Sequence, residues 1–126
     1  MMLIDTDVIV DYARGFTKAQ QFLNSTYKVH KYSISVVTAI EFVKGARDKR
    51  AQKIAEDLIS KFSVMEITDK ISKRSFELIK KFHLNYSLAL ADSLIASTAL
   101  EYKARLLTKN QKDFDFIPSL SVESPY

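Results

Sequence analysis

Short apolar runs alternate along the chain with stretches in which apolar residues recur at helical spacing. The runs predict strands near residues 1–4, 32–34, 63–67, 105–108 and 120–122. Apolar residues three and four positions apart predict helices near residues 8–13, 18–23, 38–44 and 48–62, then from Thr68 onward and at 90–102. Strands that alternate with helices indicate an α/β domain with a mostly parallel sheet covered on both faces.

The size and composition of the chain suit one packed core. It has 126 residues, of which 47% are hydrophobic and 27% charged. No internal repeat and no linker rich in Gly, Ser or Pro divides it. We therefore predict a single domain over residues 1–126, with residues 123–126 loose.

Several classes of function are excluded by composition. Without cysteine the chain has no disulfide, no thiolate nucleophile and no cysteine-built zinc site. Its two glycines, Gly15 and Gly45, lie too far apart for a phosphate-binding glycine loop. The amino end carries acids before any base, unlike a signal peptide, and no uncharged stretch approaches the roughly 20 residues of a membrane span. We expect a cytoplasmic protein with no membrane contact.

The charge balance favours an anionic partner. Nineteen Lys and Arg residues against fifteen Asp and Glu give a formal net charge of +4, and nucleic acid is the commonest such partner. Five basic residues crowd one window, namely Lys44, Arg47, Lys49, Arg50 and Lys53. They either bind RNA phosphates or form an ordinary solvent-exposed helix face, and the sequence leaves both interpretations open.

Polar residues stand where the predicted parallel strands end, which is where ligands bind in such sheets. Asp5 ends the first strand, and Asn110 follows the strand that ends at Thr108. Asp92 and Glu41 lie in helices among apolar neighbours. A buried lone carboxylate costs several kcal/mol unless it is paired or binds a metal, so Asp92 is the most informative single residue.

Convergent carboxylates predict a divalent metal site. With only His30 and His83 available for imidazole ligation, oxygen ligands favour Mg²⁺ or Mn²⁺ over zinc. Such ions activate water and neutralise charge during attack on a phosphate. The pattern therefore predicts phosphodiester hydrolysis.

Four segments of the chain, taken together, resemble the motifs of a known family. The segments are residues 3–7, 35–45, 90–96 and 106–114. In order and spacing they are similar to the four motifs of PIN-domain proteins, above all the VapC-type toxins of VapBC toxin–antitoxin pairs. The resemblance therefore covers nearly the whole chain, and the ordered set makes it specific.

The resemblance implies a three-layer α/β/α fold and an endoribonuclease that depends on Mg²⁺ or Mn²⁺. It also implies an RNA substrate such as tRNA, a VapB-like antitoxin and a homodimer. Asp5 and Asp92 correspond to metal ligands and Glu41 to a further acid of the metal site. Thr6 and Thr108 match small hydroxyl positions that hold the acidic cluster by hydrogen bonds.

The fourth position of the family pattern, often acidic, is Asn110 here. The resemblance makes it catalytic together with Asp5, Glu41 and Asp92. An amide adds no charge, so a second metal ion would be held less tightly. Asp113 is an alternative occupant of this position, with a structural role for the Asp113–Phe114 pair as the competing interpretation.

Simpler interpretations of the acids exist. Asp5 and Asp7 suit a helix N-terminus, and for Asp7 we favour that role. Glu41 could pair with Lys44 on a helix surface, and Asp92 could cap its helix.

Two other functions compete with the nuclease. A catalytically silent module that binds RNA or a partner is suggested by Asn110. A phosphorylated receiver domain would share the acids after the first strand and the Thr108–Lys109 pair. It would also need a phospho-accepting Asp after its central strand, whereas the strand at 63–67 leads into Thr68 and Asp69 at a helix cap.

Overall fold

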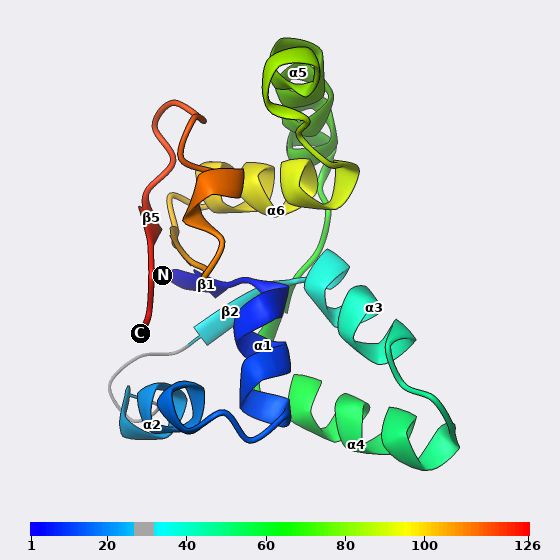
Figure 1. Cartoon of the computed structure of the whole chain (residues 1–126). Helices are drawn as coiled ribbons and strands as arrows, with labels where there is room; N and C mark the ends of the chain where they lie inside the picture. Colours follow the sequence, from blue (N-terminus) through cyan, green and yellow to red (C-terminus); the bar gives the residue numbers. More distant parts are fainter. Residues whose placement is uncertain (27–31) are drawn as a thin grey trace.

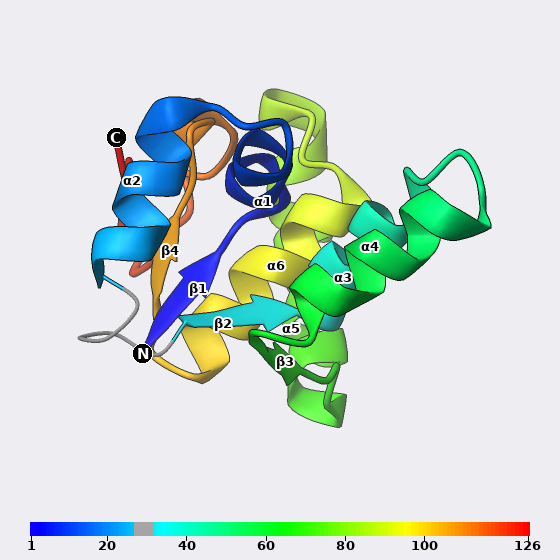
Figure 2. The same cartoon turned by 90° about the horizontal axis from the view of Figure 1, so that it is seen from below.

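Five parallel strands form the centre of the computed structural model, which describes residues 1–26 and 32–126. The strands are β1 (Met2–Ile4), β2 (Tyr32–Ser35), β3 (Ser63–Met65), β4 (Arg105–Leu107) and β5 (Val122–Glu123). Their order across the sheet is β3-β2-β1-β4-β5. Figure 2 shows β3, β2, β1 and β4 side by side. The predicted parallel sheet is confirmed.

Helices cover both faces of this sheet (Figure 1). They are α1 (Thr6–Ala13), α2 (Thr17–Thr26), α3 (Val36–Lys44), α4 (Lys49–Ile59), α5 (Asp69–Tyr86) and α6 (Leu90–Glu101), followed by a 3₁₀ turn, η1 (Gln111–Asp113). None of the helices within the described ranges has the length and apolar character that crossing a membrane requires. The α/β/α layering is the one predicted.

Two apolar cores, one on each face, follow from the alternation of side chains along the strands. Leu3 and Leu106 point into the core that α5 and α6 complete. Their successors Ile4 and Leu107 point into the core beneath α1 and α2. The sheet is therefore buried on both faces, as expected for parallel strands with helical connections.

Helix N-caps set the element boundaries. Thr68 caps α5 as predicted, since its Oγ1 accepts a hydrogen bond from the Ile71 amide at 3.2 Å. The first helix begins at Thr6 rather than near Val8, because Asp5 itself is the N-cap. Helix α6 begins at Leu90, as predicted, after Ala89, which offers no capping side chain.

The C-terminal residues are docked, so the expectation that 123–126 are loose was wrong. Glu123 belongs to β5, which pairs with β4. The Tyr126 hydroxyl donates to Asp11 Oδ2 at 2.7 Å, and its ring lies 5.8 Å from that of Phe16 and 6.4 Å from that of Phe22. Pairing of β5 with β4 and the contacts of Tyr126 with Asp11, Phe16 and Phe22 hold the end of the chain.

Candidate active site

Asp5 lies at the carboxyl end of the central strand and is almost fully buried. Its Oδ1 accepts from the Thr6 amide at 2.8 Å, which makes it the cap of α1. Its Oδ2 accepts from Thr108 Oγ1 at 2.7 Å, directly after the neighbouring strand β4. Asp5 is therefore both a helix cap and a carboxylate fixed between two strand ends.

Glu41 reaches the same region from α3. Thr6 Oγ1 donates to Glu41 Oε1 at 2.9 Å, and the same hydroxyl lies 3.0 Å from Thr38 Oγ1. Glu41 forms no ion pair with Lys44, although both residues are described. The hydroxyl contacts that the family resemblance implied for Thr6 and Thr108 are present.

Asp7 belongs to the cluster, contrary to our interpretation of it as a helix cap. Asp7 lies in the first turn of α1, where its Oδ2 accepts from the Lys109 amide and from Asn110 Nδ2, both at 3.0 Å. Its Oδ1 is buried and has no hydrogen-bond partner in the part of the chain that the structure describes. The carboxylate thus braces the loop after β4, a role that local sequence did not reveal.

Asp92 enters from the first turn of α6 and is half-buried. Because α6 begins at Leu90, Asp92 is not its cap. The pKa of Asp92 is raised to about 6, first by burial and then by the charges of Asp113, Glu41 and Asp7. Four acids from four parts of the chain therefore share one electrostatic environment.

The pKa of Asp5 is likewise raised to about 7, first by burial and then by the neighbouring Asp7 charge. Hydrogen bonds from Thr108 and Thr6 act in the opposite direction. The pKa of Asp7 is raised as well, first by burial. None of the ion pairs among the described residues includes these acids, so within residues 1–26 and 32–126 no basic side chain pairs with the cluster.

Both candidates for the fourth position, Asn110 and Asp113, lie near the cluster. Asn110 directs its amide nitrogen at Asp7, and its backbone N–H donates to Thr108 Oγ1 at 3.0 Å. Among the neighbouring charges, that of Asp113 in η1 contributes most to the raised pKa of Asp92. Asn110 therefore braces the cluster, whereas Asp113 brings the additional negative charge.

The chemistry of the cluster fits a divalent cation. Hard cations prefer carboxylate oxygens, and a cation would relieve both the repulsion among these acids and the unpartnered Oδ1 of Asp7. In the described part of the chain, however, no three His, Asp or Glu side chains stand close enough together to form a ready metal site. His83 is exposed on α5, and His30 lies outside the described residues.

Comparison with known proteins places the chain in a family. The PIN domain family model matches residues 2–118, so the chain belongs to the PIN-domain family. Within that family it is similar to Ribonuclease VapC10 of Mycobacterium tuberculosis, at 30% identity over 95% of this chain and 90% of the relative. Ribonuclease VapC1 of Methanocaldococcus jannaschii is also 30% identical, over 90% of this chain and 79% of the relative.

The chain is also similar in structure to a solved toxin–antitoxin protein. A toxin–antitoxin complex from Klebsiella pneumoniae contains a chain that superposes with a TM-score of 0.82 at 31% identity, covering 100% of this chain and 98% of that one. A receiver domain would have strand order 2-1-3-4-5, whereas the order here is 3-2-1-4-5 with β3 at the edge. The receiver alternative therefore fails on topology as well as on family.

Proposed function

We propose that this protein is a Mg²⁺- or Mn²⁺-dependent endoribonuclease that acts as the toxin of a type II toxin–antitoxin pair. One observation carries the proposal. Asp5, Asp7 and Asp92 have raised pKa values, Glu41 lies in the same cluster, and none of the described basic side chains forms an ion pair with these acids. A carboxylate cluster of this kind is stable in its charged form only when a cation joins it.

In the proposed mechanism Asp5, Asp92 and Glu41 would hold the ion. When bound, it would supply an activated water and neutralise charge on the phosphate under attack. Thr108 keeps the Asp5 carboxylate oriented through its 2.7 Å hydrogen bond. Asp7 and Asn110 fix the loop after β4, so that Asp113 faces the cluster from η1.

RNA is the proposed substrate. The relatives that match most of this chain are named ribonucleases, and the net charge of +4 suits a polyanion. A structured RNA such as tRNA is the first substrate to test. The single domain, the homodimer and the cytoplasmic location stay predictions.

A VapB-like antitoxin is the proposed partner, because the similar Klebsiella structure is a toxin–antitoxin complex. A groove of about 710 Å³ between α1, α3 and α4 offers it a surface. Phe42, Ile54 and Leu58 line this groove, and Glu41 lies along its wall. An amphipathic segment that filled the groove would end beside the acidic cluster, from which a basic side chain could exclude the metal ion.

The test is cleavage of tRNA by purified, antitoxin-free protein in Mg²⁺, in Mn²⁺ and in EDTA, beside Asp92→Asn prepared identically. We expect metal-dependent cuts at defined positions, lost by at least about 100-fold in the variant, because one ligand and its charge are gone. Asp115→Asn, at an exposed acid outside the cluster, is the matched control and keeps the activity.

Two outcomes contradict the proposal. Cleavage that persists unchanged in Asp92→Asn would place the activity elsewhere or in a contaminant. If the folded wild type cleaves none of several RNAs, the catalytically silent binding module is favoured. Asn110→Asp is then the first variant in which to look for cleavage.

A further inference from the structure

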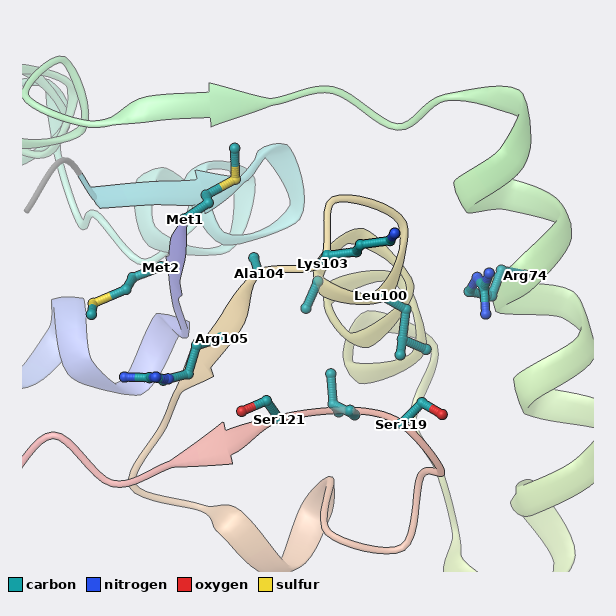
Figure 3. A pocket seen from close by; sticks show the side chains of 11 residues that line it. Met1, Met2, Arg74, Leu100, Lys103, Ala104, Arg105, Ser119 and Ser121 are labelled. Atoms are coloured by element: carbon teal, nitrogen blue, oxygen red, sulfur yellow. The ribbon is translucent and has the colours of Figure 1, made fainter.

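A second cavity opens at the edge of the sheet opposite the acidic cluster. It measures about 890 Å³ and lies beside the amino ends of β1 and β4, between the end of α6 and the segment that leads into β5 (Figure 3). Because β1 runs from Met2 in this cavity toward Asp5, the two sites lie at opposite ends of the same strand. Nothing in the proposed nuclease mechanism uses it.

Every ionisable side chain that lines the cavity is basic: Arg74, Lys103 and Arg105. The acids that pair with the two arginines, Glu101 and Glu123, are not part of the lining. Figure 3 shows the Lys103 side chain extending toward the side where Arg74 lies, with Arg105 on the other side. The cavity is therefore cationic.

These basic groups retain unused hydrogen-bond donors. Arg74 contacts Glu101 through Nε at 2.6 Å, and Arg105 contacts Glu123 through Nη1 at 3.2 Å, so each guanidinium keeps further N–H groups. The Lys103 amino group has no hydrogen-bond or ion-pair partner among the residues that the structure describes.

The nearby helix end does not cancel this positive charge. Helix α6 ends at the cavity, and the C-terminal carbonyls of a helix carry partial negative charge. Three of those carbonyls already accept backbone N–H groups from the turn that follows, in the pairs Tyr102 to Thr98, Lys103 to Leu100 and Ala104 to Ala99. The negative end of the helix dipole is therefore partly satisfied by the backbone and does not offset the charge of Lys103.

The rest of the lining suits a ligand with an apolar part. Leu100 and Leu120 give apolar surface, and Ser119 and Ser121 add hydroxyls. The volume falls in the usual range for small-molecule sites, about 300 to 1,000 Å³. An inorganic anion would leave the apolar surface unused, whereas a nucleotide offers a base for the leucines and a phosphate for the cations.

We propose that this cavity binds the phosphate of a nucleotide, either a free nucleotide or one unit of an RNA strand. The site is separate from the acidic cluster and goes beyond the proposed nuclease function. Lys103, which has no competing partner among the described residues, makes the principal contact.

At Lys103 a substitution can remove the amino group without destabilising the fold. Its φ of 52° lies in the left-handed region, at the position after α6 where glycine is the usual residue. Lys103→Gly therefore removes the amino group while relieving the backbone, and its Tm should equal or exceed that of the wild type. Lys18→Gln, at an exposed lysine of α2 outside the cavity, is the matched control.

The experiment measures binding of adenosine 5′-monophosphate and of a short single-stranded RNA by calorimetry in EDTA. We expect saturable binding of at least one ligand by the wild type, about tenfold weaker in Lys103→Gly and unchanged in Lys18→Gln. Binding of the mononucleotide identifies a free nucleotide as the ligand, and binding of RNA alone identifies a unit of RNA.

Absence of saturable binding to both ligands, or equal affinities of wild type and Lys103→Gly, would overturn the proposal. Because EDTA suppresses metal-dependent cleavage, this result is independent of the nuclease test. Failure here leaves the nuclease proposal standing, and failure of cleavage leaves this site untouched.

Discussion

At the residue scale, the charged acids of the cluster lower the stability of the metal-free protein. The pKa values of Asp5 and Asp92 rise from 3.8 to about 7 and about 6. At pH values between 3.8 and these raised pKa values, the two carboxyl groups keep protons in the folded protein that they have released in the unfolded chain. The free energy of unfolding of the metal-free protein therefore falls as pH rises through this window.

This predicts that Asp92→Asn is more stable than the wild type in EDTA. At pH 7.5 the substitution removes a repelled charge, and because the side chain is half-buried and screened we expect about 1 kcal/mol, or a few degrees in Tm. Thermal unfolding at pH 5 and pH 7.5 measures the effect. The Tm advantage should shrink at pH 5, where the wild-type carboxyl is largely protonated.

The control is Asp115→Asn, which leaves the pH dependence of the wild type unchanged. Added Mg²⁺ or Mn²⁺ should raise the Tm of the wild type and of this control, and raise that of Asp92→Asn much less. The prediction fails if the Tm of the wild type in EDTA increases from pH 5 to pH 7.5. That result would mean that burial and mutual repulsion do not raise the pKa values of Asp5 and Asp92.

At the element scale, the docked chain end supports the loop after β4. Lys109 lies under the Tyr126 ring, with its Nζ 4.8 Å from the ring centroid, and the same residue's amide donates to Asp7. The Lys109 amino group also contacts the Tyr126 carbonyl oxygen. The end of the chain therefore reaches the acidic cluster through a single intermediate residue.

Tyr126→Phe should lower the free energy of unfolding by about 1 kcal/mol, because the hydrogen bond to Asp11 is lost. Tyr126→Ala should cost about 1 to 2 kcal/mol more, since the ring contacts with Phe16 and Phe22 are lost too. Urea denaturation measures both. Tyr102→Ala, at a more exposed tyrosine, should stay within about 0.5 kcal/mol, and equal stability of all three would mean that the end is not docked.

At the scale of the whole molecule, the fold separates three surfaces. The acidic cluster lies at the carboxyl ends of the strands, the groove between α1, α3 and α4 lies beside it, and the cationic cavity lies at the opposite strand ends. The groove and the acidic cluster share Glu41. If the proposed function is right, a variant that affects partner binding without affecting catalysis must lie in the part of the groove far from Glu41.

Ile54 offers that separation, because its side chain is 62% exposed on α4 and lines the groove. We expect Ile54→Glu to weaken binding of the cognate VapB-like antitoxin at least about tenfold, since a charge would be buried against an apolar segment. Affinity measured with purified antitoxin tests this. Phe76→Glu, at an equally exposed apolar side chain on α5, is the control, and equal losses in both variants would exclude the groove.

The sequence by itself determined the elements and the main acids. Apolar periodicity placed the strands and helices, and the ends of the strands marked Asp5 and Asn110. Asp92 stood out because an acid among apolar helix neighbours needs a cation or a partner. These features are local, and the burial of each element's apolar face is enough to specify them.

Only the tertiary structure decided the contacts between distant parts of the chain. Thr108 meets Asp5 across 103 positions, and Lys109 meets Asp7 across 102, through pairing of β4 with β1. That pairing turned Asp7 from an expected helix cap into a brace. Pairing of β5 with β4 likewise docked Tyr126 against α1 and α2. Periodicity within a segment carries no information on which strand lies beside it, so these roles appear only when the sheet is assembled.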